Sequence, residues 1–258
     1  MIEAAFAARR TAGQAALVPY VTAGFPEADS TVPVLEALAV AGADVIEVGV
    51  PFSDPLADGP TIQASSFRSL ENGTTMERVL QDVASFRARH DVAIVLFTYL
   101  NPVVRFGAER FLAAAHDAGA HGLLLTDLPA GADPALEAEV IASPLDFVRL
   151  VAPTTPSDRI PAISKGASGF LYYISRTGVT GARTELRSEL GAEVDRLRSR
   201  VDLPVAVGFG ISTPEQAASV GGVADGVVVG SALVQRIGNE GVDAAAAFVG
   251  SLRGALGR

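Results

Sequence analysis

Two acidic residues, Glu47 and Asp58, lie within residues 45–63 and could carry proton-transfer chemistry. Glu47 interrupts an apolar run that is typical of a strand covered on both faces, and burial raises the pKa of a carboxyl group toward neutral pH. Asp58 follows in a loop that three prolines stiffen. A buried acid beside a rigid acidic loop indicates an active site that uses general acid–base catalysis.

Each acid in this stretch also has a purely structural interpretation. Glu47 could be a buried acid that pairs with an arginine, although the nearby loop acids favour catalysis. Asp54 lies between Ser53 and Pro55, where its side chain could simply cap a turn. The sequence leaves the role of Asp54 open.

The composition excludes several other chemistries. The 258 residues include 29 acidic and 20 basic side chains, and the net charge of −9 argues against a nucleic-acid surface. There is no cysteine, and only three histidines and one lysine, Lys165, are present. Disulfides and thiol catalysis are therefore excluded, and we expect no metal site. The absence of a long apolar run and of a leader-like start predicts a soluble, cytoplasmic protein.

Short apolar runs alternate with helical patterns along the whole chain, and nothing resembles a linker. We predict strands at residues 16–21, 45–50, 93–99, 122–125, 147–151, 169–174, 205–207 and 226–229. We predict helices at residues 2–11, 30–41, 61–71, 75–90, 109–118, 134–142, 157–165, 184–200 and 214–220, and after Ser231 and Val242. This alternation predicts one α/β domain over residues 1–258, a (β/α)₈ TIM barrel with extra short helices. A doubly wound open sheet is the alternative, but no nucleotide-binding glycine motif follows the first strand.

The loops after the strands share one face of such a barrel. Glycines and a helix start follow strands seven and eight, at Gly208–Ser212 and Gly230–Leu233, and this pattern favours a phosphate site. Tyr99 and Asn101 sit at the end of strand three, where Pro102 alone could explain a turn. Asp127 follows strand four, where it either orients a neighbour or caps a turn. Residues 175–182 are typical of a loop that closes over a ligand, or of a plain surface connection.

Several motifs in the predicted order resemble the alpha chain of tryptophan synthase from about Leu17 onward. The most specific is EVGVPFSDPLADGPTIQ at residues 47–63. PYVTAG, YLNP, APTTP, SRTGVTGA, GFGIS and GSALV support it, and they begin at Pro19, Tyr99, Ala152, Ser175, Gly208 and Gly230. Phe25 departs from the family pattern, where an aspartate is frequent.

The resemblance implies retro-aldol cleavage of indole-3-glycerol phosphate to indole and glyceraldehyde 3-phosphate. It assigns Glu47 as general acid and base, and Asp58 as the acceptor of the indole N–H. Cleavage of a carbon–carbon bond needs an electron sink, which the C3-protonated indole itself supplies. The implied substrate contacts are Tyr20, Tyr99, Leu124, Tyr172, Thr180, Gly181, Phe209, Gly210, Gly230 and Ser231.

The resemblance also implies a partner, a beta chain that carries pyridoxal phosphate, within an alpha2beta2 complex. Residues 52–60 and the YLNP segment would contact it, and residues 177–182 would close the site. This chain itself would bind no cofactor. Alternatives are a stand-alone lyase that releases indole, a non-catalytic activating subunit and, less favoured, a phosphosugar isomerase.

Overall fold

The computed structural model describes residues 1–175, 183–208 and 210–257, and within them eight parallel strands close into a barrel. Each strand pairs with its neighbours in chain order, and β8 pairs with β1. Closure confirms the predicted TIM barrel over the open sheet, which would leave two unpaired edges. The strands are β1 (Ala16–Thr22), β2 (Val45–Gly49), β3 (Ala93–Thr98), β4 (Gly122–Leu125), β5 (Asp146–Val151), β6 (Leu171–Ile174), β7 (Val205–Gly208) and β8 (Gly226–Val229).

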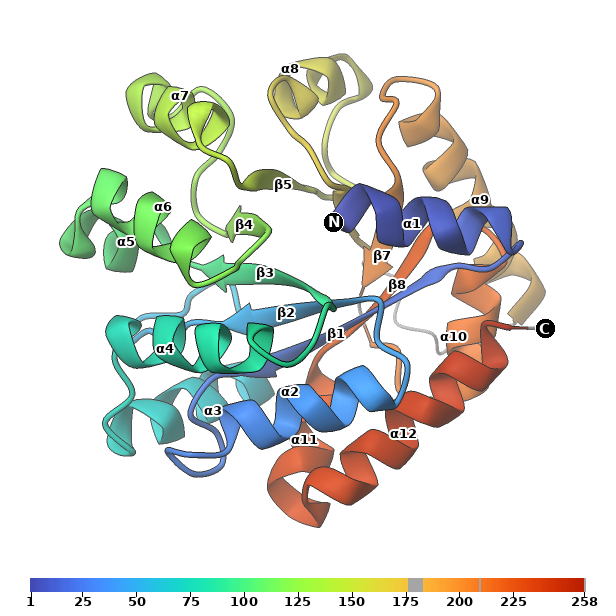
Figure 1. The fold of residues 1–258 in the computed structure, drawn as a ribbon. Coiled ribbons are helices and arrows are strands. Elements are labelled where there is room, and N and C mark those ends of the chain that lie inside the picture. The colour runs from blue at the N-terminus through green and yellow to red at the C-terminus, as the bar shows by residue number, and fades with distance from the viewer. Residues whose placement is uncertain (176–182, 209, 258) are drawn as a thin grey trace.

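The connecting helices lie outside the ring of strands (Figure 1). They are α2 (Thr31–Val40), α3 (Pro60–Glu71), α4 (Met76–Arg87), α5 (Leu100–Phe106), α6 (Ala108–Asp117), α7 (Pro134–Ala142), the 3₁₀ turn η1 (Ser157–Arg159), α8 (Ile160–Ser164), α9 (Arg183–Arg198), α10 (Pro214–Gly221), α11 (Ser231–Glu240) and α12 (Val242–Ala255), and α1 (Ile2–Thr11) precedes the first strand. None of the helices in the described residues is long and apolar enough to cross a membrane.

Side-chain caps set the starts of several helices. Thr75 accepts the N–H of Arg78 at the start of α4, and Asp133 accepts the N–H of Leu136 at the start of α7. Thr213 and Gln216 form a reciprocal capping box at α10. These caps satisfy backbone donors that the first helical turn leaves unpaired.

Side chains along each strand point alternately into the barrel and toward the helices, and this divides the core into two layers. One set of side chains packs between the barrel and the helices, and the other fills the barrel interior. Ile2 and Phe6 of α1 belong to the interior set, and Phe6 stacks on Phe170 with ring centroids 5.3 Å apart. A Cβ at Gly226 would come within 2.8 Å of the Phe6 ring. Helix α1 therefore closes the end of the barrel where the strands begin.

The prediction of residues 99–102 as a strand end and turn was incomplete, because helix α5 starts at Leu100. Pro102 is the third residue of this helix, and a proline in the first turn removes no helical hydrogen bond. Strand β6 also starts two residues later than predicted, at Leu171, since Gly169 has a φ of +75° that ends extended pairing.

Asp44 joins three elements at the closed end of the barrel, just before β2. Its carboxylate accepts hydrogen bonds from the Arg9 guanidinium of α1 at 2.6 Å and from Arg253 of α12 at 2.9 Å. It also accepts the N–H of Leu17 in β1 at 2.8 Å, and its side chain is only 7% exposed. One acid thus ties the first helix, the last helix and the barrel together.

Asp44→Ala is expected to lower the free energy of unfolding by about 3 kcal/mol, because it leaves buried arginine charge and a strand N–H unpaired. This loss corresponds to a Tm decrease on the order of 6–12 °C, measurable by thermal denaturation. Asp91→Ala, at a fully solvated acid, is the control and should leave Tm nearly unchanged. A Tm decrease of the same small size in both variants would refute the role of Asp44.

Candidate active site

Glu47 lies in the barrel interior, at the middle of β2. It shares the inward face of β2 with Val45, and its Cα pairs in register with Tyr20 of β1. The residue is 1% exposed, and its Oε1 atom has no hydrogen-bond partner in the described residues. Burial raises the pKa of Glu47 from its usual 4.5 to about 8. The carboxyl group is therefore largely protonated at neutral pH.

No ion pair to Glu47 is found in the part of the chain that the structure describes. The arginines that carry buried charge lie elsewhere, as Arg149 does beside Glu137 and Arg253 beside Asp44. The described residues therefore do not support the interpretation of Glu47 as the buried partner of an arginine. An unpaired, protonated carboxyl group instead suits a proton donor.

Asp58 sits in the loop between β2 and α3, at the mouth of the same cavity. Its Oδ2 accepts a hydrogen bond from the hydroxyl of Tyr99 at 3.0 Å, and that hydroxyl accepts the N–H of Ala57 at 3.0 Å. Burial raises the pKa of Asp58, and the hydrogen bond from Tyr99 opposes this shift. Gln63 donates to the Asp58 carbonyl oxygen at 2.9 Å and helps to hold the loop. Asp58 is thus fixed at a defined place beside the cavity.

Asp54, in the same loop, is exposed and accepts a hydrogen bond from its neighbour Ser53 at 2.6 Å. It does not line the cavity. No cap by the Asp54 side chain occurs among the described hydrogen bonds, and its place outside the cavity lining gives no support to a catalytic role.

A cavity of about 540 Å³ opens at the ends of the strands and reaches both acids. Aromatic and aliphatic side chains make up most of its wall, and polar groups lie at two ends. The lining residues are Tyr20, Glu47, Ala57, Asp58, Gly59, Pro60, Ile62, Phe97, Thr126, Leu150, Tyr172, Ile174, Gly208, Gly210, Ile211, Ser212, Val228, Gly230, Ser231, Ala232 and Gln235. An apolar pocket with a few convergent polar groups suits a small ligand with an aromatic part.

Two tyrosines, Tyr20 of β1 and Tyr172 of β6, line the space around Glu47. Tyr20 packs edge-on against Phe97, with ring centroids 5.2 Å apart. A Cβ at Gly49 would collide with the Tyr20 hydroxyl, and one at Gly208 would collide with the Tyr172 hydroxyl. These two glycines give the tyrosine rings the room to reach across the interior.

The other polar end of the cavity is formed by backbone. Gly210 has a φ of +69°, and Gly230 occupies the N-cap position of α11 without a side-chain cap. The first N–H groups of a helix have no acceptor within it, so they attract an anion. Gly210, Gly230 and Ser231 line this end together, as the predicted phosphate site requires.

Not every predicted contact lies on the cavity wall. Leu124 is fully buried and packs with Val148 in the core, and Tyr99 reaches the cavity through Asp58. We therefore correct the expectation that these two side chains line the cavity. Thr180, Gly181 and Phe209, with the rest of segment 177–182, lie outside the described residues.

Other wall residues were not predicted from the sequence. Phe97, Leu150, Ile174 and Val228 continue the inward alternation of their strands, so period-two counting from the barrel core could have found them. Gln235 follows Ser231 by one helical turn on α11, so this spacing could have predicted that both residues face the cavity. Thr126 and Ile62 carry no comparable signal.

Comparison with known proteins identifies the family of this chain. The family model described as the tryptophan synthase alpha chain matches residues 6–251. The chain belongs to the tryptophan synthase alpha chain family. It is 48% identical to the tryptophan synthase alpha chain of Rhizorhabdus wittichii over 98% of this chain and 95% of that protein. It is 51% identical to that of Gluconacetobacter diazotrophicus over 89% of this chain and 84% of that protein.

The fold of this alpha chain family member agrees with solved structures. A crystal structure of tryptophan synthase from M. tuberculosis in a ligand-free form superposes with a TM-score of 0.91 at 33% identity, over 100% of this chain and 99% of that one. The family that the motifs resembled is thereby confirmed, as is its barrel. No cluster of three or more metal-binding side chains occurs among the described residues of this alpha chain.

Proposed function

We propose that this chain cleaves indole-3-glycerol phosphate to indole and glyceraldehyde 3-phosphate, as the lyase subunit of a tryptophan synthase. The observation that carries the proposal is the buried, unpaired carboxyl group of Glu47, which faces one cavity with Asp58 and whose pKa burial raises. Family membership supports the reaction class.

Glu47 acts first as the acid. It transfers its proton to C3 of the indole ring, and the ring becomes an electrophilic indoleninium cation. Asp58 accepts a hydrogen bond from the ring N–H and offsets the positive charge that develops there. An aromatic wall that includes Tyr20, Phe97 and Tyr172 suits the flat ring.

Glu47 then acts as the base. Its carboxylate removes the proton of the glycerol hydroxyl next to the breaking bond, and the carbonyl of the aldehyde forms. The electron pair of the carbon–carbon bond returns to the ring, which leaves as indole. The proton that Glu47 gave is thus restored within one turnover.

The backbone groups at Gly210, Gly230 and Ser231 would hold the phosphate of the glycerol chain, and Ser231 adds a hydroxyl donor. A beta chain that carries pyridoxal phosphate would receive the indole, in an alpha2beta2 complex. Residues 52–60 and the start of α5 lie at the open end of the barrel, where such a partner would dock. This chain itself would need no cofactor.

Indole release from purified chain and indole-3-glycerol phosphate tests the proposal directly. We expect turnover by the isolated chain and a higher rate when a cognate beta chain is titrated to saturation. Turnover that the beta chain leaves unchanged would point to a stand-alone lyase. Absence of indole under both conditions would refute the proposed activity and favour a non-catalytic subunit.

The pH dependence should report the state of Glu47. Because the free enzyme must carry the proton and burial raises the pKa of Glu47 to about 8, kcat/KM should fall roughly tenfold per pH unit above pH 8. Initial rates of indole release between pH 6 and pH 10 measure this limb. A flat profile through pH 9.5 would contradict the assignment of Glu47 as the acid.

A further inference from the structure

Helix α5 has no side-chain cap of its own, and a neighbouring loop supplies one. Tyr99 is its N-cap residue and makes no cap hydrogen bond with its side chain. Instead, Oδ1 of Asp127, in the loop between β4 and α7, accepts the N–H of Leu100 at 2.6 Å. We propose that Asp127 is a positioning residue that holds Tyr99 and, through it, the carboxylate of Asp58. This inference rests on the proposed function and adds a residue that acts outside the cavity.

The second link is the buried hydroxyl group of Tyr99. It donates to Asp58 and accepts from the N–H of Ala57, so it fixes the loop at two adjacent residues. Tyr99 is 4% exposed, and its ring packs against Phe52 with ring centroids 5.1 Å apart. Since Leu100 follows Tyr99 directly, a shift at the start of α5 would move the hydroxyl and the acid that it holds.

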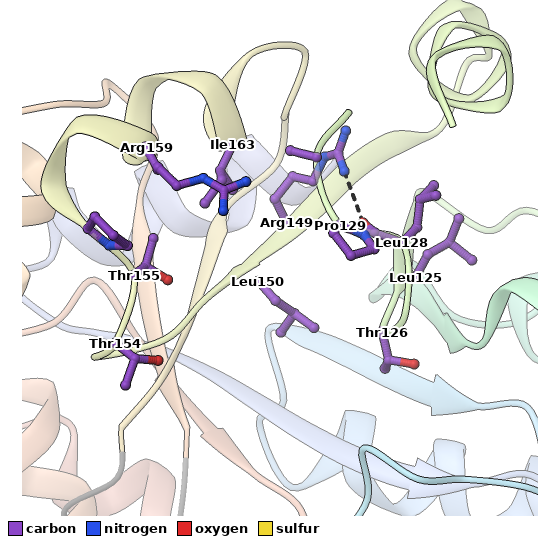
Figure 2. Close-up of a pocket in the computed structure, with 12 residues that line it drawn as sticks. Leu125, Thr126, Leu128, Pro129, Arg149, Leu150, Thr154, Thr155, Arg159 and Ile163 are labelled. Atoms are coloured by element: carbon purple, nitrogen blue, oxygen red, sulfur yellow. Dashed lines mark hydrogen bonds between the residues drawn. The ribbon is translucent and has the colours of Figure 1, made fainter. Parts of the chain in front are cut away.

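The loop that carries Asp127 is itself held from behind. The Arg149 guanidinium donates to the carbonyl oxygen of Leu128 at 3.3 Å, a bond drawn in Figure 2, and forms an ion pair with Glu137 at 2.5 Å. Glu137 also accepts the N–H of Gly131 at 2.6 Å. Arg149 and Glu137 are 5% and 13% exposed, so this buried pair fixes the loop on both sides of Pro129. Asp127 therefore has a rigid support.

Thr126 connects this support to the cavity. Its N–H and its hydroxyl both donate to the Thr98 carbonyl oxygen, at 3.0 Å and 3.2 Å, at the end of β3. Thr126 also lines the substrate cavity and the smaller cavity of about 300 Å³ shown in Figure 2. Hydrogen bonds thus join the end of β3, the loop after β4 and the start of α5 next to Asp58.

A positioning role predicts a specific change in catalysis. If Tyr99 loses its place, Asp58 loses the hydrogen bond that favours its ionised form, and the pKa of Asp58 rises. The other titratable groups facing Asp58 from the barrel are Glu47, Tyr20 and Tyr172, and none of them is altered by a change at Asp127. The acid limb of the rate profile should then move to higher pH.

The experiment compares Asp127→Ala, Asp127→Asn and Tyr99→Phe in the full chain. The asparagine keeps an acceptor for the Leu100 N–H but removes the negative charge. We expect kcat/KM to fall about tenfold in Asp127→Ala and in Tyr99→Phe, with the acid limb displaced upward by about half a pH unit or more. Asp127→Asn should stay within about threefold of wild type and keep its acid limb.

Asp243→Ala is the control, because it removes an acid from the first turn of α12, a helix that makes no hydrogen bond to Tyr99 or to the loop of Asp127 among the described residues. It should lower Tm slightly and leave the pH profile in place. Equal displacement of the acid limb in Asp127→Ala and Asp127→Asn would assign the effect to charge and overturn the proposal. An active wild type with an unshifted Asp127→Ala variant would also overturn it, whereas an inactive wild type would instead refute the proposed function.

Discussion

Glu47→Gln is expected to lower kcat for indole release by about 10³-fold or more, because the amide has no proton to transfer to C3. Substrate binding should survive, since the amide has nearly the same size and the proposed phosphate-binding residues lie elsewhere on the cavity wall. Indole release measures turnover, and calorimetric titration with the substrate measures Kd. Glu3→Gln, at an exposed acid of α1, is the control and should keep wild-type rates. Turnover by Glu47→Gln within tenfold of wild type would remove Glu47 from its role.

The same substitution should stabilise the fold near neutral pH. The folded-state pKa of about 8 lies above the ordinary value of 4.5, so between these pH values the folded chain binds more protons than the unfolded chain. Stability is therefore lost as pH rises through this window, and removal of the titrating group restores it. We expect a gain on the order of 3 kcal/mol at pH 7 that shrinks toward pH 4.5. Urea denaturation at pH 5 and pH 7 checks the trend, and a variant less stable than wild type at pH 7 would contradict it.

Asp58→Asn is expected to lower kcat by about 10²-fold or more, because a neutral amide cannot offset positive charge on the protonated ring. The hydrogen bond to Tyr99 can persist, since the amide oxygen still accepts from its hydroxyl, and the loop should keep its place. Steady-state kinetics should therefore show a large loss in kcat with a smaller change in KM. Asp29→Asn, at an exposed acid in the loop before α2, serves as the control. A loss confined to KM would assign Asp58 to ground-state binding alone.

The barrel and its principal acid could be predicted because both depend on local pattern. Alternation of strands with helices specifies parallel pairing, and the apolar neighbours of Glu47 specify its burial. The meeting of Gly210 and Gly230 at one cavity could be predicted too, since these glycines follow successive strands. Such features need no knowledge of the packing between distant segments.

The remaining site residues depend on three-dimensional arrangement. Leu124 has the inward parity of a wall residue, but strand register places it beside Val148 in the closed core. Tyr99 was expected at the ligand, and only the path of α5 turns its hydroxyl toward Asp58. The cap from Asp127 to Leu100 joins residues 27 positions apart, a distance over which sequence pattern carries no information.

Gly49 and Gly208 limit how the cavity can change to accept a larger ligand. The hydroxyl groups of Tyr20 and Tyr172 occupy the volume where side chains at these glycines would otherwise lie. The width of the cavity is therefore set jointly by two glycines and two tyrosine hydroxyl groups. Natural or laboratory selection for bulkier heterocycles would have to alter these pairs together, because enlarging one member of a pair displaces the other.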